Sequence, residues 1–176
     1  MNYIKIPVGY LEANCYIVFD ENSKDAVIID PGDESEIIVK KIISNKLKPL
    51  VLINTHDHFD HTGANNTICK EFNIKPNYPE KDNETKNFGT LKLKFILTPG
   101  HSLDGICILI ENHLFSGDTL FEDSIGRTDL EGGDEKQLLE SIKNKLLILP
   151  EETIVHPGHG PDTTIEKEIN HNPFLK

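Results

Sequence analysis

The sequence predicts an α/β fold with two β-sheets inside and helices outside. Short apolar or alternating segments typical of strands are separated by segments of helical periodicity. The order strand, strand, helix, strand is followed by further strands and another helix, which indicates two similar halves. A chain of 176 residues is long enough for one domain with a proper core and too short for two comfortable ones. Residues 1–176 are therefore predicted to form a single domain.

The first half contains three predicted strands and two predicted helices. Apolar and alternating patterns predict strands at residues 14–19, 26–30 and 50–53. A helix is expected between the second and third strands, because Asp33 and Glu36 have the spacing of a capping box. Pro49 is expected to end this helix. A second helical pattern covers residues 62–72.

The second half repeats this scheme. Strands are predicted at residues 91–97, 105–110, 113–116 and 153–156. A helix is predicted to begin within 134–137 and to end before Pro150, and a short last helix is predicted at 164–170. Residues 73–87 are expected to form an exposed connection that could include a short helix, and 118–133 a loop.

Composition excludes several classes of function. The formal net charge of −11 argues against nucleic acid or an anionic membrane as a partner, since both require a basic face. The sequence has no apolar run long enough for a transmembrane helix, and its first residues lack the layout of a signal peptide. Its three cysteines are far apart and are expected to be buried in a reducing compartment. We expect a cytoplasmic monomer or small homo-oligomer that acts on a small molecule.

The densest cluster of chemically active residues is Asn54 to Gly63, directly after the apolar strand at 50–53. Imidazole and carboxylate side chains are ligands for zinc or iron. His56 and His58 are two apart and can close on one ion, whereas the adjacent Asp60 and His61 point elsewhere and could hold a second. A polar turn without metal would not need so many ligand-type residues.

Three further strand ends deliver residues of the same kind. His101 follows Pro99-Gly100, Asp118 follows Gly117, and His159 lies within Gly158-His159-Gly160. In open sheets, ligand sites lie at strand ends, so these residues are candidates for the same site.

This pattern resembles the metallo-β-lactamase-fold superfamily. The matching features are the His-x-His-x-Asp-His run, the lone His after Pro-Gly, the Asp after Gly, and the His within Gly-His-Gly. The resemblance implies an αββα sandwich with a dinuclear metal site between the sheet edges. It assigns His56, His58 and His101 to one ion, Asp60, His61 and His159 to the other, and Asp118 to both.

Finer features resemble the small single-domain relatives of glyoxalase II, the hydroxyacylglutathione hydrolase-like proteins. These features are the segments 124–134, 157–164 and 172–175. The resemblance implies hydrolysis of a thioester of the S-lactoylglutathione type. The expected cofactors are two divalent ions, Zn²⁺ first, with Fe or Mn as alternatives. A metal-bridging hydroxide would attack the thioester carbonyl, and Asp60 would also be catalytic by steering the water's proton.

The same resemblance leaves the thiol carrier open. The C-terminal helical domain with which two-domain glyoxalase II grips glutathione is not expected, because few residues follow His159. A persulfide dioxygenase of the same superfamily is the main alternative. It holds one iron with the positions that match His56, His101 and Asp118. A lactonase or β-lactamase-like hydrolase is expected less, and a non-catalytic metal-binding protein least.

Several polar residues outside the ligand set have two interpretations. Arg127, the only arginine, could anchor a substrate carboxylate or fix its own loop by pairing with Asp129. Asp30 could be a turn carboxylate or an acceptor that orients a metal-bound histidine. Thr55 and Ser102 could be donors behind the ligands or turn residues. Three histidines are predicted not to be ligands: His113, His156 and His171.

Overall fold

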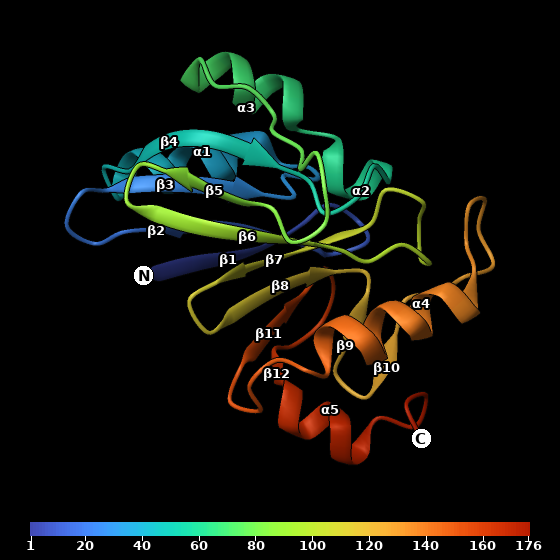
Figure 1. Ribbon diagram of the computed structural model, residues 1–176. Helices are drawn as coiled ribbons and strands as arrows, with labels where there is room; N and C mark the ends of the chain where they lie inside the picture. The colour runs from blue at the N-terminus through green and yellow to red at the C-terminus, as the bar shows by residue number, and fades with distance from the viewer.

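Two β-sheets pack face to face, and helices cover the outer face of each (Figure 1). The computed structural model describes residues 1–176. In Figure 1, α1 (Ser35–Ser44) and α3 (Asn65–Phe72) lie over one sheet, and α4 (Glu135–Ser141) and α5 (Ile165–His171) lie on the opposite side of the molecule. The predicted αββα sandwich is therefore confirmed.

The first sheet has the strand order β1-β2-β3-β4. Its strands are β1 (Asn2–Val8), β2 (Ala13–Phe19), β3 (Asp25–Ile29) and β4 (Lys48–Ile53). The first three strands are antiparallel, and α1 crosses over to β4, which runs parallel to β3. The carboxyl ends of β3 and β4 consequently lie at the same edge of the sheet.

The second sheet has the order β12-β11-β8-β7-β6-β5. Its strands are β5 (Thr85–Phe88), β6 (Leu91–Leu97), β7 (Ile106–Ile110), β8 (His113–Gly117), β11 (Ile154–Pro157) and β12 (Thr163–Thr164). β6, β7 and β8 are antiparallel, and β11 is parallel to β8 after the crossover helix α4, which continues into a π-helical turn, η1 (Ile142–Leu146). Both halves therefore share one topology, as the sequence indicates.

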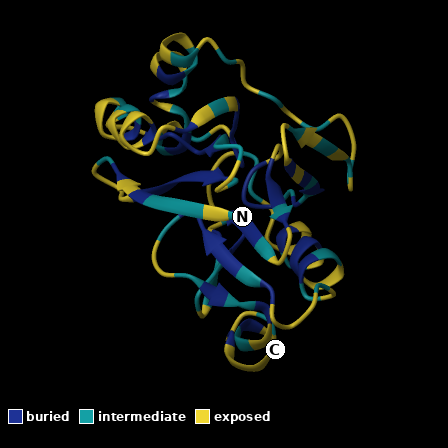
Figure 2. Ribbon diagram, turned by 90° about the vertical axis from the view of Figure 1, so that its left-hand side faces the viewer, coloured by how far each residue is buried: buried dark blue, intermediate teal, exposed yellow.

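The period of two in the strands divides the core into layers. On β2, Ile17 packs against Ile38 of α1, whereas the next residue, Val18, belongs to the apolar layer between the sheets with Phe95 of β6. A third apolar cluster lies between the second sheet and α4 and includes Leu138. Figure 2 shows the buried strands inside and exposed residues on the outer helices. Each fully buried aliphatic side chain contributes about 1.5–3 kcal/mol to folding.

Two strands of four or more residues were not predicted, β1 and β5, and both lie at sheet edges; the two-residue strands β9, β10 and β12 were not predicted either. β1 contains Pro7, which only an edge strand tolerates readily, and its sequence was considered only as a leader. β5 lies within residues 73–87, the expected exposed connection; the short helix considered there is absent. The loop at 118–133 contains a small hairpin of β9 (Leu120–Phe121) and β10 (Ser124–Ile125).

Three details of the predicted helices are wrong. The pattern at 62–72 is split into α2 (Phe59–Thr62) and α3, with Gly63 packed against the carbonyl of Gly32 between them. The N-cap of α1 is Glu34 in a left-handed conformation, and the carboxylate of Asp33 accepts the adjacent Glu34 N–H, so no capping box forms. Pro49 lies within β4, because α1 already ends at Ser44.

The predicted start of α4 is correct, since the Asp134 carboxylate accepts the backbone N–H of Gln137. All three cysteines are free; Cys15 and Cys107 are buried as expected, whereas Cys69 is only partly buried. None of the helices has both the length and the apolar character needed to cross a membrane.

Candidate metal centre

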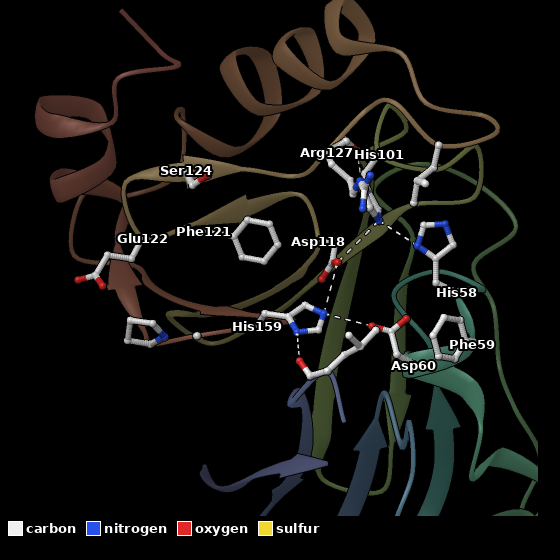
Figure 3. A pocket seen from close by; sticks show the side chains of 14 residues that line it. His58, Phe59, Asp60, His101, Asp118, Phe121, Glu122, Ser124, Arg127 and His159 are labelled. Carbon is white, nitrogen blue, oxygen red and sulfur yellow. Dashed lines mark hydrogen bonds and ion pairs between the residues drawn. The ribbon is translucent and has the colours of Figure 1, made fainter. Parts of the chain in front are cut away.

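Strand ends from both halves deliver ligand-type side chains to one cleft (Figure 3). β4 is followed by the turn that carries His56 and His58, and by α2, which carries Asp60 and His61. From the second half, β6 leads to His101, β8 to Asp118 and β11 to His159. The structure therefore brings together all seven residues predicted as metal ligands.

Three groups of three side chains have the compactness of metal sites: two share no residue, and the third, His56, His61 and Asp118, joins them. In the first group, His56, His58 and His101, one potential ligand atom from each side chain lies within 4.8 Å of the others. Within it, His58 Nδ1 and His101 Nε2 are 3.0 Å apart. The second group, Asp60, His61 and His159, meets the same limit. Each group supplies three donors, which leaves open positions for other ligands.

Asp118 lies between the two groups. Its Oδ1 is 3.4 Å from His61 Nε2, and its Oδ2 is 3.7 Å from His101 Nε2 and 3.6 Å from His159 Nε2. One carboxylate therefore faces ligands of both groups, which is the position required of a bridging ligand.

The buried polar atoms of the site indicate a missing binding partner of positive charge. His56 Nε2, His61 Nε2 and Asp118 Oδ1 are buried and have no hydrogen-bond partner. Buried polar atoms are costly when unpaired, and almost all of them in folded proteins are satisfied. A set of imidazoles and carboxylates suits divalent zinc, iron or manganese. The residues present therefore fit a divalent metal centre.

The ring nitrogens that face away from the site are fixed by hydrogen bonds. His101 Nδ1 donates to the carbonyl of Arg127 at 2.8 Å, and His159 Nδ1 donates to that of Leu11 at 3.0 Å. His56 Nδ1 lies 3.0 Å from the Thr55 hydroxyl. A proton held at Nδ1 leaves the lone pair of Nε2 directed into the site, as metal binding requires.

Asp30 anchors the first-half turn from behind. Its Oδ1 accepts the Thr55 N–H at 2.7 Å, and its Oδ2 accepts the Thr55 hydroxyl at 2.6 Å. The same Oδ2 is 3.1 Å from His61 Nδ1. Asp30 and Thr55 thus lie where the orienting role considered for them would require them. Ser102 is buried, but its hydroxyl has no partner.

Burial and neighbouring charges set the protonation states. Burial, together with the surrounding imidazoles, lowers the pKa of His56, so this histidine is neutral at pH 7, the form that binds metal. Burial raises the pKa of Asp118. For His61, burial opposes protonation, but the carboxylates of Asp30, Asp118 and Asp60 together outweigh it and raise the pKa to about 9. A bound cation would compete with this proton.

Two glycines are required where the second half approaches the site. A Cβ on Gly158 would lie 2.1 Å from Asp118 Oδ1 and 2.8 Å from His61 Cε1. Gly117 has φ +50°, and a Cβ there would lie 2.3 Å from the Thr55 hydroxyl. The absence of side chains at these positions lets Asp118 and His61 approach each other.

The donors lie at the base of a cleft of about 760 Å³. Phe59 and Phe121 flank the donors in Figure 3, and Leu11, Leu130 and Pro161 also line the cleft. Arg127 lines it as well, but its guanidinium makes two hydrogen bonds to Asp129, at 2.7 and 2.8 Å. The cleft therefore combines an apolar wall with a base rich in metal ligands.

The other predicted residues lie outside the two groups. His113 and His156 bond to each other, and His171 bonds to its own helix. The carbonyls of Arg127 and Leu11 were not anticipated, because a backbone contact has no residue-type signature. For the Arg127 carbonyl, the only signal in the sequence was that Arg127 lies in the loop after β8.

The comparisons agree with this geometry. The sequence model of the metallo-beta-lactamase superfamily matches residues 8–87 and 75–159. The chain therefore belongs to the metallo-beta-lactamase superfamily, a superfamily of metallo-hydrolases whose fold binds divalent metal ions.

Two curated relatives match over nearly their whole length. The probable metallo-hydrolase YqgX of Bacillus subtilis is 35% identical, over 99% of this chain and 98% of the relative. The hydroxyacylglutathione hydrolase GloC of Haemophilus influenzae is 35% identical with the same coverage, 99% and 98%.

Three solved structures are similar to the chain. BLEG-1 B3 metallo-beta-lactamase has a TM-score of 0.93 and 39% identity, covering 99% of this chain and 100% of its own. ETHE1 from Myxococcus xanthus has a TM-score of 0.92 and 28% identity, covering 98% and 84%. TTHA1623, solved in a di-iron-bound form, has a TM-score of 0.86 and 34% identity, covering 98% and 100%.

Proposed function

We propose that the protein is a dinuclear-metal hydrolase that cleaves a thioester of the hydroxyacylglutathione type. The observation that carries this proposal is the second donor group, Asp60, His61 and His159, which faces Asp118 as the first group does. The likeness to GloC over the whole chain supports the choice of thioester. The free cysteines suit a reducing compartment, in accordance with the cytoplasmic location that we expect.

In this proposal His56, His58, His101 and Asp118 hold one ion, while Asp60, His61, His159 and Asp118 hold the other. Zn²⁺ is the expected metal, although the di-iron form of TTHA1623 makes iron a real alternative. Divalent ions bound there would supply hydroxide at neutral pH and polarise the substrate carbonyl.

The chain's own residues perform the remaining tasks. Phe59, Phe121 and Leu130 give the cleft an apolar lining against which the substrate can pack. A thiol has a pKa of about 8.5, so a thiolate leaves without a strong general acid. Asp60, whose Oδ2 lies 3.3 Å from His159 Nε2, is assigned the further task of steering the proton of the attacking water. The Arg127–Asp129 pair favours a loop-fixing role for Arg127 over a substrate anchor.

The test is hydrolysis of S-D-lactoylglutathione by protein purified without chelator, followed by the loss of thioester absorbance. We expect turnover that His58→Ala abolishes. Asp60→Ala is expected to lower turnover and the occupancy of one ion together. If the folded protein carries two ions and still shows no turnover, the glutathione thioester is the wrong substrate.

A persulfide dioxygenase is the second candidate, and one observation favours it. The ETHE1 structure superimposes with a TM-score of 0.92. The first proposal remains preferred, because one iron held by His56, His101 and Asp118 would leave the second donor group without a function. A single iron per chain together with oxygen uptake on addition of glutathione persulfide would establish this second candidate instead.

A further inference from the structure

The turn that carries His159 is fixed to the opposite half of the molecule. It follows β11 and spans residues 157–162. The His159 side chain is 29% exposed, whereas that of His61 is fully buried. His61 lies on α2 and is bonded to Asp30 of its own half. His159 has neither a helix nor a carboxylate behind it, so something else must hold its turn.

The backbone carbonyls of this turn accept hydrogen bonds from β1 and β2. The Pro157 carbonyl accepts from the Tyr16 hydroxyl at 2.7 Å and from Asn14 Nδ2 at 2.9 Å. The Gly158 carbonyl accepts the backbone N–H of Asn14 at 2.7 Å. The Gly160 carbonyl accepts from Lys5 Nζ at 2.7 Å and from Asn14 Nδ2 at 3.0 Å. The carbonyls before and after His159 are thus both tied to the first sheet.

Asp162 holds Lys5 in this position. Its Oδ1 accepts from Lys5 Nζ at 2.9 Å. Its Oδ2 accepts from His156 Nδ1 at 2.9 Å and from the Tyr3 hydroxyl at 3.0 Å. Lys5 and Asp162 are both partly buried, with side chains 23% and 27% exposed, so the pair is less screened than a fully exposed pair. One lysine thereby joins two points of the turn after His159, the Gly160 carbonyl and the Asp162 carboxylate, to β1.

We propose that Lys5 and Asp162 are positioning residues for His159 and thereby set the affinity of the site formed by Asp60, His61 and His159. The inference rests on the ligand set of the proposed function. Neither residue is among the metal donors, so both act through the backbone of the turn. The group of His56, His58 and His101 shares none of these contacts and supplies an internal reference.

The experiment is a metal titration of the whole chain, after removal of metal, with Zn²⁺ in competition with a chromogenic chelator. The variants are Lys5→Met and Asp162→Asn. Lys24→Met is the matched control, because Lys24 also pairs with a carboxylate of the first half, Glu21, but lies in the β2–β3 turn. Supporting contacts around metal sites typically change metal affinity 10–100-fold. In both variants we expect one of the two ions to lose roughly 10-fold or more in affinity, and the other ion to be unchanged.

Two further measurements separate positioning from general stability. The unfolding temperatures of the metal-free variants are compared with that of Lys24→Met, and Lys5→Arg, which keeps a donor at this position, is expected to recover much of the lost affinity. If Lys5→Met does not fold, Asp162→Asn and Lys5→Arg carry the test. Equal weakening of both ions, or no weakening of either, would overturn the proposal.

Failure of the positioning role and failure of the proposed function would give different results. A wild-type protein that binds two ions but hydrolyses no thioester would refute the proposed substrate and leave the affinities of the variants to decide the positioning role. A wild-type protein that binds only one ion would overturn the positioning role as well, because no second site would exist for it to serve.

Discussion

In the first half, the strand before the crossover helix ends at Ile29 and is followed by Asp30; in the second half, the corresponding strand ends at Gly117 and is followed by Asp118. Asp30 and Gly117 both have a φ of +50°. Asp30 carries its carboxylate behind the metal centre, where it orients Thr55 and His61. Asp118, one residue further along, carries its carboxylate into the centre. The same backbone turn thus provides a supporting residue in one half and a candidate ligand in the other.

The two halves also differ in how their strands supply the candidate ligands. β4 leads into one turn and helix with four candidate ligands, of which His56 and His61 are 3% and 0% exposed. The second half supplies its three from three separate strand ends. We call the four candidate ligands on this turn and helix of the first half the platform, and the three candidate ligands of the second half the closing residues. Changes to the platform should affect both ions, whereas most changes to the closing residues should affect one.

Asp118 is the exception among the closing residues and should give the largest effect. Asp118→Ala removes the only carboxylate that faces both donor groups, so both ions should bind more weakly. A metal centre supplies several kcal/mol of transition-state stabilisation, so turnover should fall about 10³-fold or more. The measurement is kcat together with metal content. Asp123→Ala, at an exposed carboxylate of the β9–β10 hairpin, is the control. Loss of only one ion would show that Asp118 does not bridge.

Gly158→Ala tests how closely the halves approach. The new methyl group would overlap Asp118 Oδ1 and His61 Cε1, so the halves must separate. Overpacking of this kind costs roughly 1–3 kcal/mol of stability and should weaken both ions. Gly160→Ala is the matched variant, because a Cβ there meets nothing within 4 Å, although its φ of +74° adds some strain. Calorimetry and metal content check the result; equal effects of the two variants would contradict it.

Asp30→Asn weakens the platform without touching a metal ligand. An amide offers one acceptor where Asp30 uses two oxygens, so the contacts to Thr55 and His61 cannot all persist. We expect a loss of metal affinity of about 10–100-fold that includes the His61 site. Metal titration checks this, with Asp33→Asn, an exposed carboxylate of the next turn, as the control. Unchanged affinity would reduce Asp30 to a turn residue.

The stability that Asp162 contributes through its contacts with Lys5 and His156 should decrease in acid. For Asp162, burial is outweighed by hydrogen bonds from His156 and Lys5, which hold the pKa of its carboxyl well below its usual range. A folded-state pKa below the unfolded value of about 3.9 gives stability that is present above that pH and lost as pH falls through the folded value. Metal-free wild-type protein should therefore lose more stability than Asp162→Asn between about pH 5 and pH 3. Urea unfolding at the two pH values measures this difference, and equal losses would remove Asp162 from the contact.

Arg127→Ala should have the smallest effect. The Arg127–Asp129 pair is exposed, and such pairs contribute little. We expect no measurable change in the unfolding temperature and a change in KM below about 2-fold. A large rise in KM with unchanged kcat would show instead that Arg127 leaves Asp129 to bind the substrate carboxylate.

The candidate metal ligands could be predicted from the sequence, because histidine and aspartate residues that directly follow buried strands form a recognisable pattern. His56, Asp118 and His159 are recognisable in this way, and Asp30 is recognisable as a candidate support. The contacts of Lys5 with Asp162 and Gly160 could not be predicted, since both join residues more than 150 positions apart and one of them uses a backbone carbonyl. β1, which supplies Lys5, was missed as an edge strand interrupted by Pro7.

The division of the seven candidate ligands between the two halves has a thermodynamic consequence. An ion bound there is a cross-link between segments that the chain brings together only on folding, so its binding free energy is also folding free energy. A free metal concentration 1,000 times the dissociation constant adds about 4 kcal/mol to stability. The melting temperature of this protein should therefore follow metal supply, and the folded population should report the availability of the ion.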